Sequence, residues 1–236
     1  MLTPFRARIA SRIAAGLWAL AGITTGLSAA ETKDGDKGGE SVLSKVFGAW
    51  TGWQDNATLH GITFQRAKTD QRGFVIGYLA ADTAIAGRPC RQGWVHLHPN
   101  GIPAGYTAAA DIPLSRLTIP AGTWVFQDDK GTLTVCSFPR DMKIQNHDCR
   151  GGIGGSEGVQ TAFYPSGALK QFFAPKAVEI EGFPCRASAF QPGIELYEDG
   201  RLKSATLDKD IVRDGHVLHG GDRVRLTPQG SLQQAH

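Results

Sequence analysis

The sequence predicts an all-β protein: an antiparallel β-sheet built from stacked hairpin repeat units, preceded by a short N-terminal capping helix. Two observations indicate this class. From Ile62 onward, apolar and polar residues alternate as they do in half-buried β-strands. Along the same part, tight-turn residues that end in glycine recur at roughly regular intervals, which is the mark of a repeat architecture. A β-solenoid, with one coil for each repeat, is the alternative fold.

Residues 1–30 show the order of features found in a secretory signal peptide. Arg6, Arg8 and Arg12 precede the apolar run IAAGLWALAGITTGL, and the small residues SAA follow it. Such a segment predicts cleavage after Ala30. We therefore expect a periplasmic or secreted protein, which meets a membrane only if its signal segment stays uncleaved.

Two short regions follow the predicted signal. Residues 31–40, ETKDGDKGGE, are charged and rich in glycine, which predicts a flexible linker. In the region 41–60, the stretch SVLSKVFGAW spaces its apolar residues as on one face of a helix, and Ser41 is a suitable N-cap. This pattern predicts a capping helix of about three turns, which is too short to be stable unless it docks on other structure.

Residues 61–236 form the predicted β-repeat domain. Glycine takes a positive φ without steric cost, so each unit is expected to contain a strand, a tight turn and a returning strand. One unit cannot bury its apolar side alone, whereas stacked units share a core. The turn glycines are Gly73, Gly101, Gly131, Gly167, Gly200 and Gly230, spaced by 28, 30, 36, 33 and 30 residues.

A second column of residues supports the repeat. Nine or ten residues after the turn glycine, four units have an aspartate, and a fifth has Ala177. We interpret these aspartates as Asx turns, in which the side chain binds the backbone just after it. They are Asp82, Asp111, Asp141 and Asp210.

The repeat core resembles a known motif. The stretches ELYEDGRLKSA and TAFYPSGALKQ are similar to the MORN-variant repeat, whose signature is an aromatic residue, two turn residues, Gly, a small or basic residue, then Leu and Lys. The resemblance covers about ten residues in each of two units. It implies a repetitive antiparallel sheet and an interaction surface, and it carries no catalytic residue.

The charge balance argues against nucleic acid as a partner. The chain has 25 Lys and Arg against 22 Asp and Glu, and residues 1–30 hold three Arg and no acid, so the predicted mature chain has 22 of each sign. A protein that binds phosphate backbones needs an excess of cations to replace counterions.

Four cysteines, Cys90, Cys136, Cys149 and Cys185, form no CxxC pair, so the pattern of a zinc ribbon or a thioredoxin-type site is missing. Cys149 and Cys185 occupy the same column of adjacent repeats. In a solenoid these positions lie about 4.8 Å apart, close enough for a disulfide, whereas a hairpin sheet would separate them by about two strands. A Cys149–Cys185 disulfide would therefore favour the solenoid.

A secreted hydrolase is the alternative function. His147 lies two residues before Cys149 on one strand face, and a thiol beside an imidazole can act as a nucleophile. The loop Gly154–Gly158, GGSEG, matches the G-x-S-x-G pattern of a nucleophile elbow. However, Ile119 and Leu218 fill the column of Cys149 in other units, which indicates a buried position, and the sequence predicts no helix after GGSEG.

Aromatic residues are the candidates for binding. Trp94 and Trp124 each follow the second glycine of a unit, and Tyr164 and Tyr197 precede the turn glycine of theirs. Such side chains can stack on sugars or pack against a protein. The sequence thus predicts a non-catalytic exported repeat protein that presents an extended β surface to an envelope protein or polysaccharide, without a metal or other cofactor.

Overall fold

The computed structural model describes residues 52–152, 158–189, 192–213 and 215–233. All regular elements in these residues are β-strands, which confirms the all-β class. The predicted signal peptide 1–30, linker 31–40 and helical stretch 41–50 lie outside the described residues. The described part of the region 41–60 contains two short strands, β1 (Gln54–Asp55) and β2 (Thr58–Leu59). None of the described elements is a helix that could cross a bilayer.

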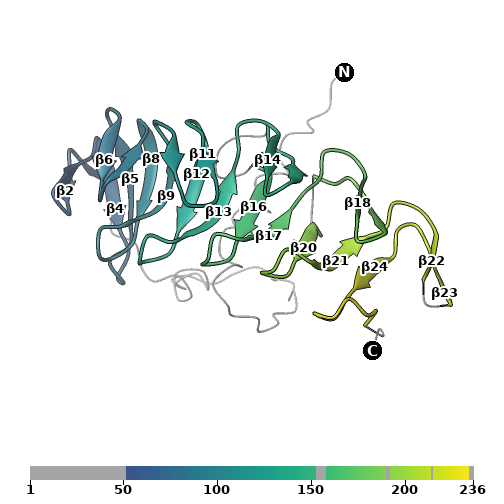
Figure 1. Cartoon of the computed structure of the whole chain (residues 1–236). Coiled ribbons are helices and arrows are strands. Elements are labelled where there is room, and N and C mark those ends of the chain that lie inside the picture. The colour runs from purple at the N-terminus through teal and green to yellow at the C-terminus, as the bar shows by residue number, and fades with distance from the viewer. Residues whose placement is uncertain (1–51, 153–157, 190–191, 214, 234–236) are drawn as a thin grey trace, which may run out of the picture. The chain divides into compact units, whose positions relative to one another are not determined.

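Twelve strands form one antiparallel sheet, in the order β1-β4-β5-β8-β9-β12-β13-β16-β17-β20-β21-β24 (Figure 1). Because neighbours in the sheet follow one another along the chain, the sheet is a succession of hairpins. Beyond β1, its strands are β4 (Arg66–Thr69), β5 (Val75–Leu79), β8 (Gly93–Leu97), β9 (Pro103–Thr107), β12 (Trp124–Gln127), β13 (Leu133–Ser137), β16 (Gln160–Phe163), β17 (Leu169–Phe172), β20 (Ile194–Leu196), β21 (Leu202–Thr206) and β24 (Arg223–Arg225).

Six small two-stranded hairpins alternate with the sheet hairpins along the chain. Each connects the end of one sheet strand to the start of the next, and Figure 1 shows those labelled β6, β11, β14 and β18 along one side of the sheet. The pairs are β2 with β3 (Ile62–Thr63), β6 (Thr83–Ile85) with β7 (Arg88–Cys90), β10 (Ile112–Pro113) with β11 (Thr118–Ile119), β14 (Met142–Ile144) with β15 (His147–Cys149), β18 (Val178–Ile180) with β19 (Phe183–Cys185), and β22 (Ile211–Arg213) with β23 (His216–Leu218).

The structure confirms the role of the predicted turn glycines. All six have φ between 77° and 89°, a region that side chains larger than glycine rarely adopt. In three of these turns an aspartate stabilises the backbone, as when Asp128 Oδ1 accepts the N–H groups of Lys130 and Thr132. The glycine spacing read from the sequence therefore marks the hairpins of the main sheet.

The hydrophobic core lies between the sheet and the small hairpins. Leu79, Val95 and Phe172 contribute to it from the sheet, and Ile85 and Phe183 contribute from the small hairpins; all five are at most 2% exposed. Each unit thus places a sheet hairpin on one side of the core and a small hairpin on the other. Burial of both apolar sides supplies the main stabilisation, as expected for stacked repeats.

Hydrogen bonds tie the tip of a small hairpin to the turn of a later sheet hairpin. The Arg88 guanidinium donates to the carbonyl of Gly131 at 3.1 Å, and the Gln145 amide donates to the carbonyl of Gly167 at 2.7 Å. The Glu181 carboxylate accepts the N–H of Leu202 at 3.2 Å. A small hairpin therefore extends across the core from one end of the sheet strands to the other.

The repeated aspartates bind the backbone differently from the Asx turns that we expected. The Oδ1 atom of each accepts the N–H of a residue ten positions later, on the far side of a small hairpin. The bonds are Asp82 to Gln92, Asp111 to Ala121, Asp141 to Gly151 and Asp210 to Gly220, at 2.7–2.9 Å. The aspartate thus closes the base of the hairpin, a long-range contact that a local turn rule does not predict.

The structure decides between the two predicted folds. Neighbouring strands of the main sheet are antiparallel and hairpin-connected, so the hairpin sheet is confirmed and the solenoid is wrong. The Cys149–Cys185 disulfide, which would have favoured the solenoid, is not formed, because all four cysteines are free and buried. Cys149 and Cys185 end β15 and β19, two different small hairpins, and each packs into the core of its own unit.

Candidate functional site

The side of the sheet that faces away from the small hairpins is the outer face. Strand register aligns one outward row across eleven strands, because each residue of the row pairs with the next. The row runs Lys68, Ile76, His96, Gly105, Phe126, Val135, Ala162, Gln171, Glu195, Ser204, Arg225. Apart from His96, this row has no polar side chain from Ile76 to Ala162, and it is polar from Gln171 onward.

An aromatic–cation cluster lies at the N-terminal end of the outer face. It consists of Trp53, Arg66, Lys68, Tyr78 and Trp94. The two indole rings lie 5.5 Å apart, and the Tyr78 ring meets that of Trp94 edge-on at 5.2 Å. The Arg66 guanidinium lies 4.4 Å and the Lys68 ammonium 4.7 Å from the centre of the Trp53 ring, which are cation–π distances.

The cluster exposes two large aromatic side chains. Trp53 and Trp94 are each 42% exposed, and among the described residues the other exposed large apolar side chains are those of Val212 and Val217, on the small hairpin β22–β23. Exposed tryptophans beside cations can bind a partner through apolar contact, stacking and charge. The sequence analysis selected Trp94 as a binding candidate and did not select Trp53, Arg66 or Lys68, because these three residues precede the first complete repeat.

Trp124, the second predicted tryptophan, also lies on the outer face. His96 of β8 and Phe126 of β12 both pair with Gly105, so the outward residues two positions before them, Trp94 and Trp124, lie in one row. Trp124 differs in being only 6% exposed. Its ring contacts His96 and Phe126 at centroid distances of 6.0 and 5.9 Å.

The predicted tyrosines connect neighbouring units. Tyr164 donates its hydroxyl hydrogen to the carbonyl of Leu196, and Tyr197 donates to the carbonyl of Leu226, at 2.9 and 2.7 Å. His98, at the equivalent turn position, binds the carbonyl of Gln127 through Nε2 at 2.9 Å. Burial, with the neighbouring Glu198 carboxylate, raises the pKa of Tyr164. These phenols therefore stabilise the stacking of units and are half-buried.

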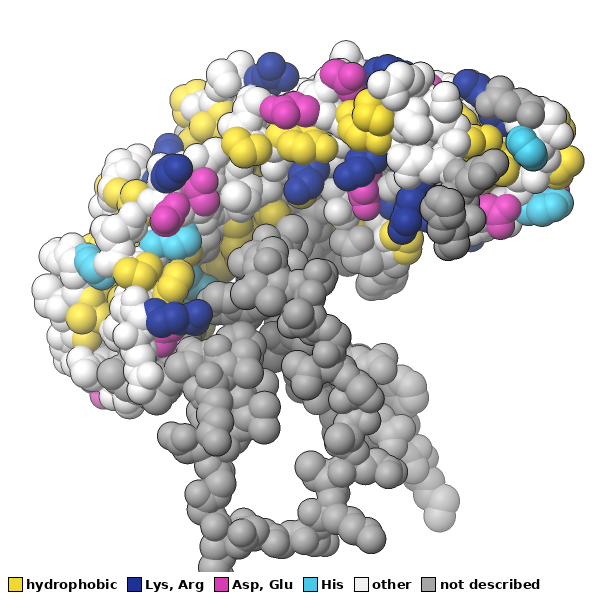
Figure 2. Space-filling view, turned by 90° about the horizontal axis from the view of Figure 1, so that it is seen from below, with side chains coloured by type: hydrophobic (Ala, Val, Ile, Leu, Met, Phe, Trp, Pro, Cys, Tyr) yellow, Lys and Arg dark blue, Asp and Glu magenta, His cyan; other side chains and the backbone are white. Residues whose placement is uncertain are grey.

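The C-terminal end of the outer face is a hydrogen-bonded polar network. Arg223 donates to the Gly193 carbonyl and to the Ser204 hydroxyl, both at 2.6 Å, and lies 3.3 Å from the Glu195 carboxylate. Basic and acidic side chains are interleaved on the described part of the side shown in Figure 2. Because Arg223 already bonds to groups of the same chain, we expect this network to contribute less to partner binding than the aromatic–cation cluster does.

The proposed nucleophile of the alternative hydrolase is poorly suited to that role. Cys149 is 0% exposed, and burial raises the pKa of its thiol to about 12, with the Asp148 carboxylate adding to the shift. The thiolate is the reactive form, so a neutral buried thiol is inert. The imidazole of His147 lies 5.0 Å from the ring of Phe172, and burial lowers the pKa of His147. Of the Gly154–Gly158 loop, only Gly158 is within the described residues.

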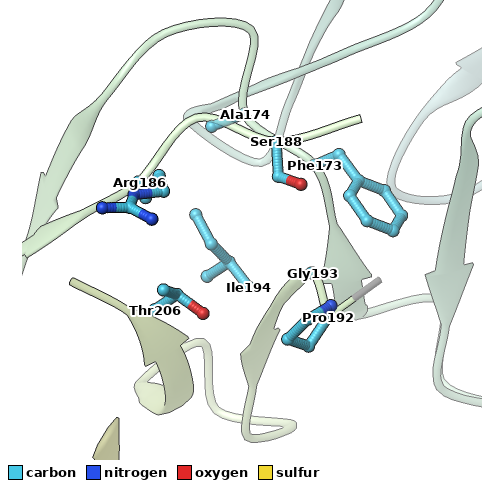
Figure 3. A pocket seen from close by; sticks show the side chains of 8 residues that line it. All are labelled: Phe173, Ala174, Arg186, Ser188, Pro192, Gly193, Ile194 and Thr206. Atoms are coloured by element: carbon cyan, nitrogen blue, oxygen red, sulfur yellow. The ribbon is translucent and has the colours of Figure 1, made fainter. Parts of the chain in front are cut away.

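A small pocket lies beside the loop that precedes β20. Its volume is about 190 Å³, and Figure 3 shows Arg186, Ser188 and Thr206 around its rim with Ile194 between them. The arginine that follows a column cysteine recurs as Arg91 and Arg150, so its presence reflects the repeat rather than this pocket. In the described chain, no three His, Cys, Asp or Glu side chains gather as metal ligands would.

The fold and this surface define a β-repeat protein with one twelve-stranded antiparallel sheet, six small hairpins and an aromatic–cation cluster on the outer face. The chain matches no protein-family model, no curated protein and no solved structure. The resemblance of its repeat core to the MORN-variant motif therefore stays a prediction.

Proposed function

We propose that the protein is a non-catalytic, exported binding protein of the cell envelope, which holds a protein or polysaccharide partner on the outer face of its sheet. The observation that carries this proposal is the exposure of Trp53 and Trp94 side by side with Arg66 and Lys68 over the Trp53 ring. Large aromatic residues and arginine supply most of the binding energy at protein interfaces, and tryptophan also stacks on sugar rings.

The geometry of the cluster supports a binding role rather than a purely structural one. The rings are held by each other and by the sheet, so a partner would find them already ordered, and ordering costs on binding would be small. Trp53 and Trp94 nevertheless keep 42% of their surface exposed to solvent. By contrast, Tyr164 and Tyr197 direct their hydroxyl groups at carbonyls of the same chain.

Binding to fractionated envelope material would test the proposal. Titration of the mature protein with envelope polysaccharide, followed by tryptophan fluorescence, tests a glycan partner, and retention of envelope proteins on the immobilised protein tests a protein partner. We expect Trp94→Ala to weaken binding at least tenfold, because an anchor residue contributes roughly 2 kcal/mol or more. Val217→Ala is the matched control, since it truncates an exposed apolar residue on β23.

If Trp94→Ala binds the partner as tightly as Val217→Ala does, the proposal that a partner binds on the outer face is wrong. The hydrolase is tested in the same preparation. Any hydrolytic activity that Cys149→Ala abolishes, in a folded variant, would replace the binding proposal with the enzymatic one.

A further inference from the structure

The aromatic–cation cluster brings apolar rings and positive charge together at one place on the sheet. Trp53 lies directly before β1 and Trp94 lies on β8, so three strand spacings, or roughly 14 Å, separate their strands. Because the ring centroids are only 5.5 Å apart, the two indoles lean toward each other over β4 and β5. Arg66 and Lys68 come from β4, and their charged groups lie 4.4 and 4.7 Å from the centre of the Trp53 ring. A partner that contacts the indoles therefore also meets two cations.

The charge of this half of the sheet favours an anionic partner. The strands β4, β5, β8, β9, β12 and β13 contain no aspartate or glutamate, and Arg66 and Lys68 are their only arginine and lysine residues. The predicted mature chain, by contrast, has equal numbers of acidic and basic residues. Positive charge without acidic residues on the same strands attracts anions to that surface.

Two acids flank the cluster, and neither forms an ion pair with Arg66 among the described residues. Asp55 lies opposite Arg66 across β1 and β4, but no ion pair joins the two side chains. Asp70, directly after β4, is 4% exposed, and its carboxylate accepts hydrogen bonds from Arg72 and from the N–H of Phe74. Arg66 is exposed, so its guanidinium can donate to a carboxylate of a partner.

The position of the cluster favours a polysaccharide over a protein. β1 is the terminal strand of the main sheet. The residues that dominate a protein interface lie near its centre, and such an interface covers about 800 Å² of each partner. A protein interface centred on the cluster would therefore extend beyond the edge of the sheet. A polysaccharide chain needs only a narrow contact, and its sugar rings stack on tryptophan.

We propose that the aromatic–cation cluster binds a polysaccharide whose sugars carry carboxylates, with a sugar ring against the exposed indoles and its carboxylate on Arg66 and Lys68. This inference rests on the proposed function and narrows its partner to one class. A uronic acid carries an apolar C–H face and an anion on one compact ring, so it matches both parts of the cluster. Arginine binds a carboxylate through two parallel N–H···O bonds, and lysine adds a point charge.

Two polymers that differ only in charge test this inference. Polygalacturonate carries a carboxylate on each sugar, and chemical reduction of its carboxyl groups gives a neutral polymer with the same linkages. In titrations followed by tryptophan fluorescence, we expect the mature protein to bind polygalacturonate about tenfold or more tightly than the reduced polymer, because charge-assisted hydrogen bonds are lost on reduction.

Substitutions in the cluster separate charge from stacking. Arg66→Gln removes the charge and keeps a polar side chain, so it should weaken polygalacturonate binding about tenfold and leave binding of the reduced polymer unchanged. Trp94→Ala should weaken the binding of both polymers, because stacking on a sugar ring does not depend on the carboxylate. Arg225→Gln is the matched control, since Arg225 is an exposed arginine in the outward row at the opposite edge of the sheet.

Three results would overturn the inference, and each leaves the proposed function to be judged separately. Equal affinity for the two polymers would mean that the carboxylate is not recognised, while binding of both that depends on Trp94 would retain a neutral polysaccharide as the partner. Equal losses for Arg66→Gln and Arg225→Gln would indicate general attraction between charges.

The third result is that neither polymer binds. Envelope proteins retained by the native protein but not by Trp94→Ala would then assign the cluster to a protein partner. The proposed function itself fails if Trp94→Ala binds every one of these materials as the native protein does.

Discussion

The two faces of the main sheet follow different rules. On the core face, equivalent positions of successive units carry similar residues, such as Val95 of β8, Val125 of β12 and Val224 of β24, and all three are at most 4% exposed. On the outer face, the residue that follows each of these valines changes from His96 through Phe126 to Arg225. The repeated face maintains the stacking of units, and the face that varies from unit to unit is where a specific function can arise.

The largest expected difference between the faces is in stability. Phe172→Ala removes a ring that is 0% exposed on the core face and should lower the free energy of unfolding by about 3–5 kcal/mol. Trp94→Ala removes a larger ring from the outer face and should cost less than about 1 kcal/mol, because 42% of the native side chain is already exposed. Urea unfolding followed by circular dichroism measures both. Similar losses in the two variants would show that the outer face is a second core.

Two glycines offer a sharper version of the same comparison. Gly77 of β5 lies on the core face, where an added Cβ would overlap the ring of Phe64. Gly105 of β9 lies on the outer face, where a Cβ would meet Phe126 at 3.4 Å and Trp124 at 3.5 Å, ordinary contact distances. We expect Gly77→Ala to destabilise by about 1–3 kcal/mol through overpacking. Gly105→Ala should be neutral or stabilise by up to about 1 kcal/mol, since alanine is favoured over glycine within strands.

The urea midpoints of the two glycine variants, measured side by side, check this prediction. A larger loss for Gly105→Ala than for Gly77→Ala would mean that the outer face is packed more tightly than the core face.

The smallest expected effect concerns a repeated position that lies outside the core. Hydrogen bonds from the N–H of Gly220 and from His219 lower the pKa of Asp210. Because the folded pKa lies below the unfolded value of about 3.9, this stabilisation is complete above that pH and is lost as the pH falls through the folded pKa. Asp210→Ala should therefore lower the urea midpoint at pH 7, and the difference from the native chain should shrink below about pH 4.

Asp208→Ala is the control for this pH series, since Asp208 is an exposed acid next to the same hairpin. A pH-independent difference for Asp210→Ala would assign its effect to packing at the hairpin base rather than to its charge.

The hairpins of the sheet were predictable because their signals are local. A glycine after turn-forming residues, with alternating residues on both sides, specifies a hairpin whatever surrounds it, and the six turn glycines show it. The repeated aspartates could also be recognised in the sequence, but the hydrogen bonds predicted for them were wrong. The partner of Asp141 is the N–H of Gly151, and the small hairpin between them brings these groups together.

The candidate site was predictable only in part. Trp94 and Trp124 lie on one face, as strand alternation implies, yet they are 42% and 6% exposed, a difference that strand alternation does not predict. Trp53, Arg66 and Lys68 had no repeat column to mark them. They join the site because β1 and β4 extend the sheet beyond the first full unit.

By itself, the sequence determined the all-β class, the number and place of the turns, and the alternation that separates a core face from an outer face, because these depend on short-range stereochemistry. The tertiary structure decided that the units stack as hairpins instead of coils, that the cysteines are buried apart and unpaired, and that tyrosines from the turns bind the next unit. Those outcomes depend on which residues of different units come into contact, and such contacts form only when the units pack on one another.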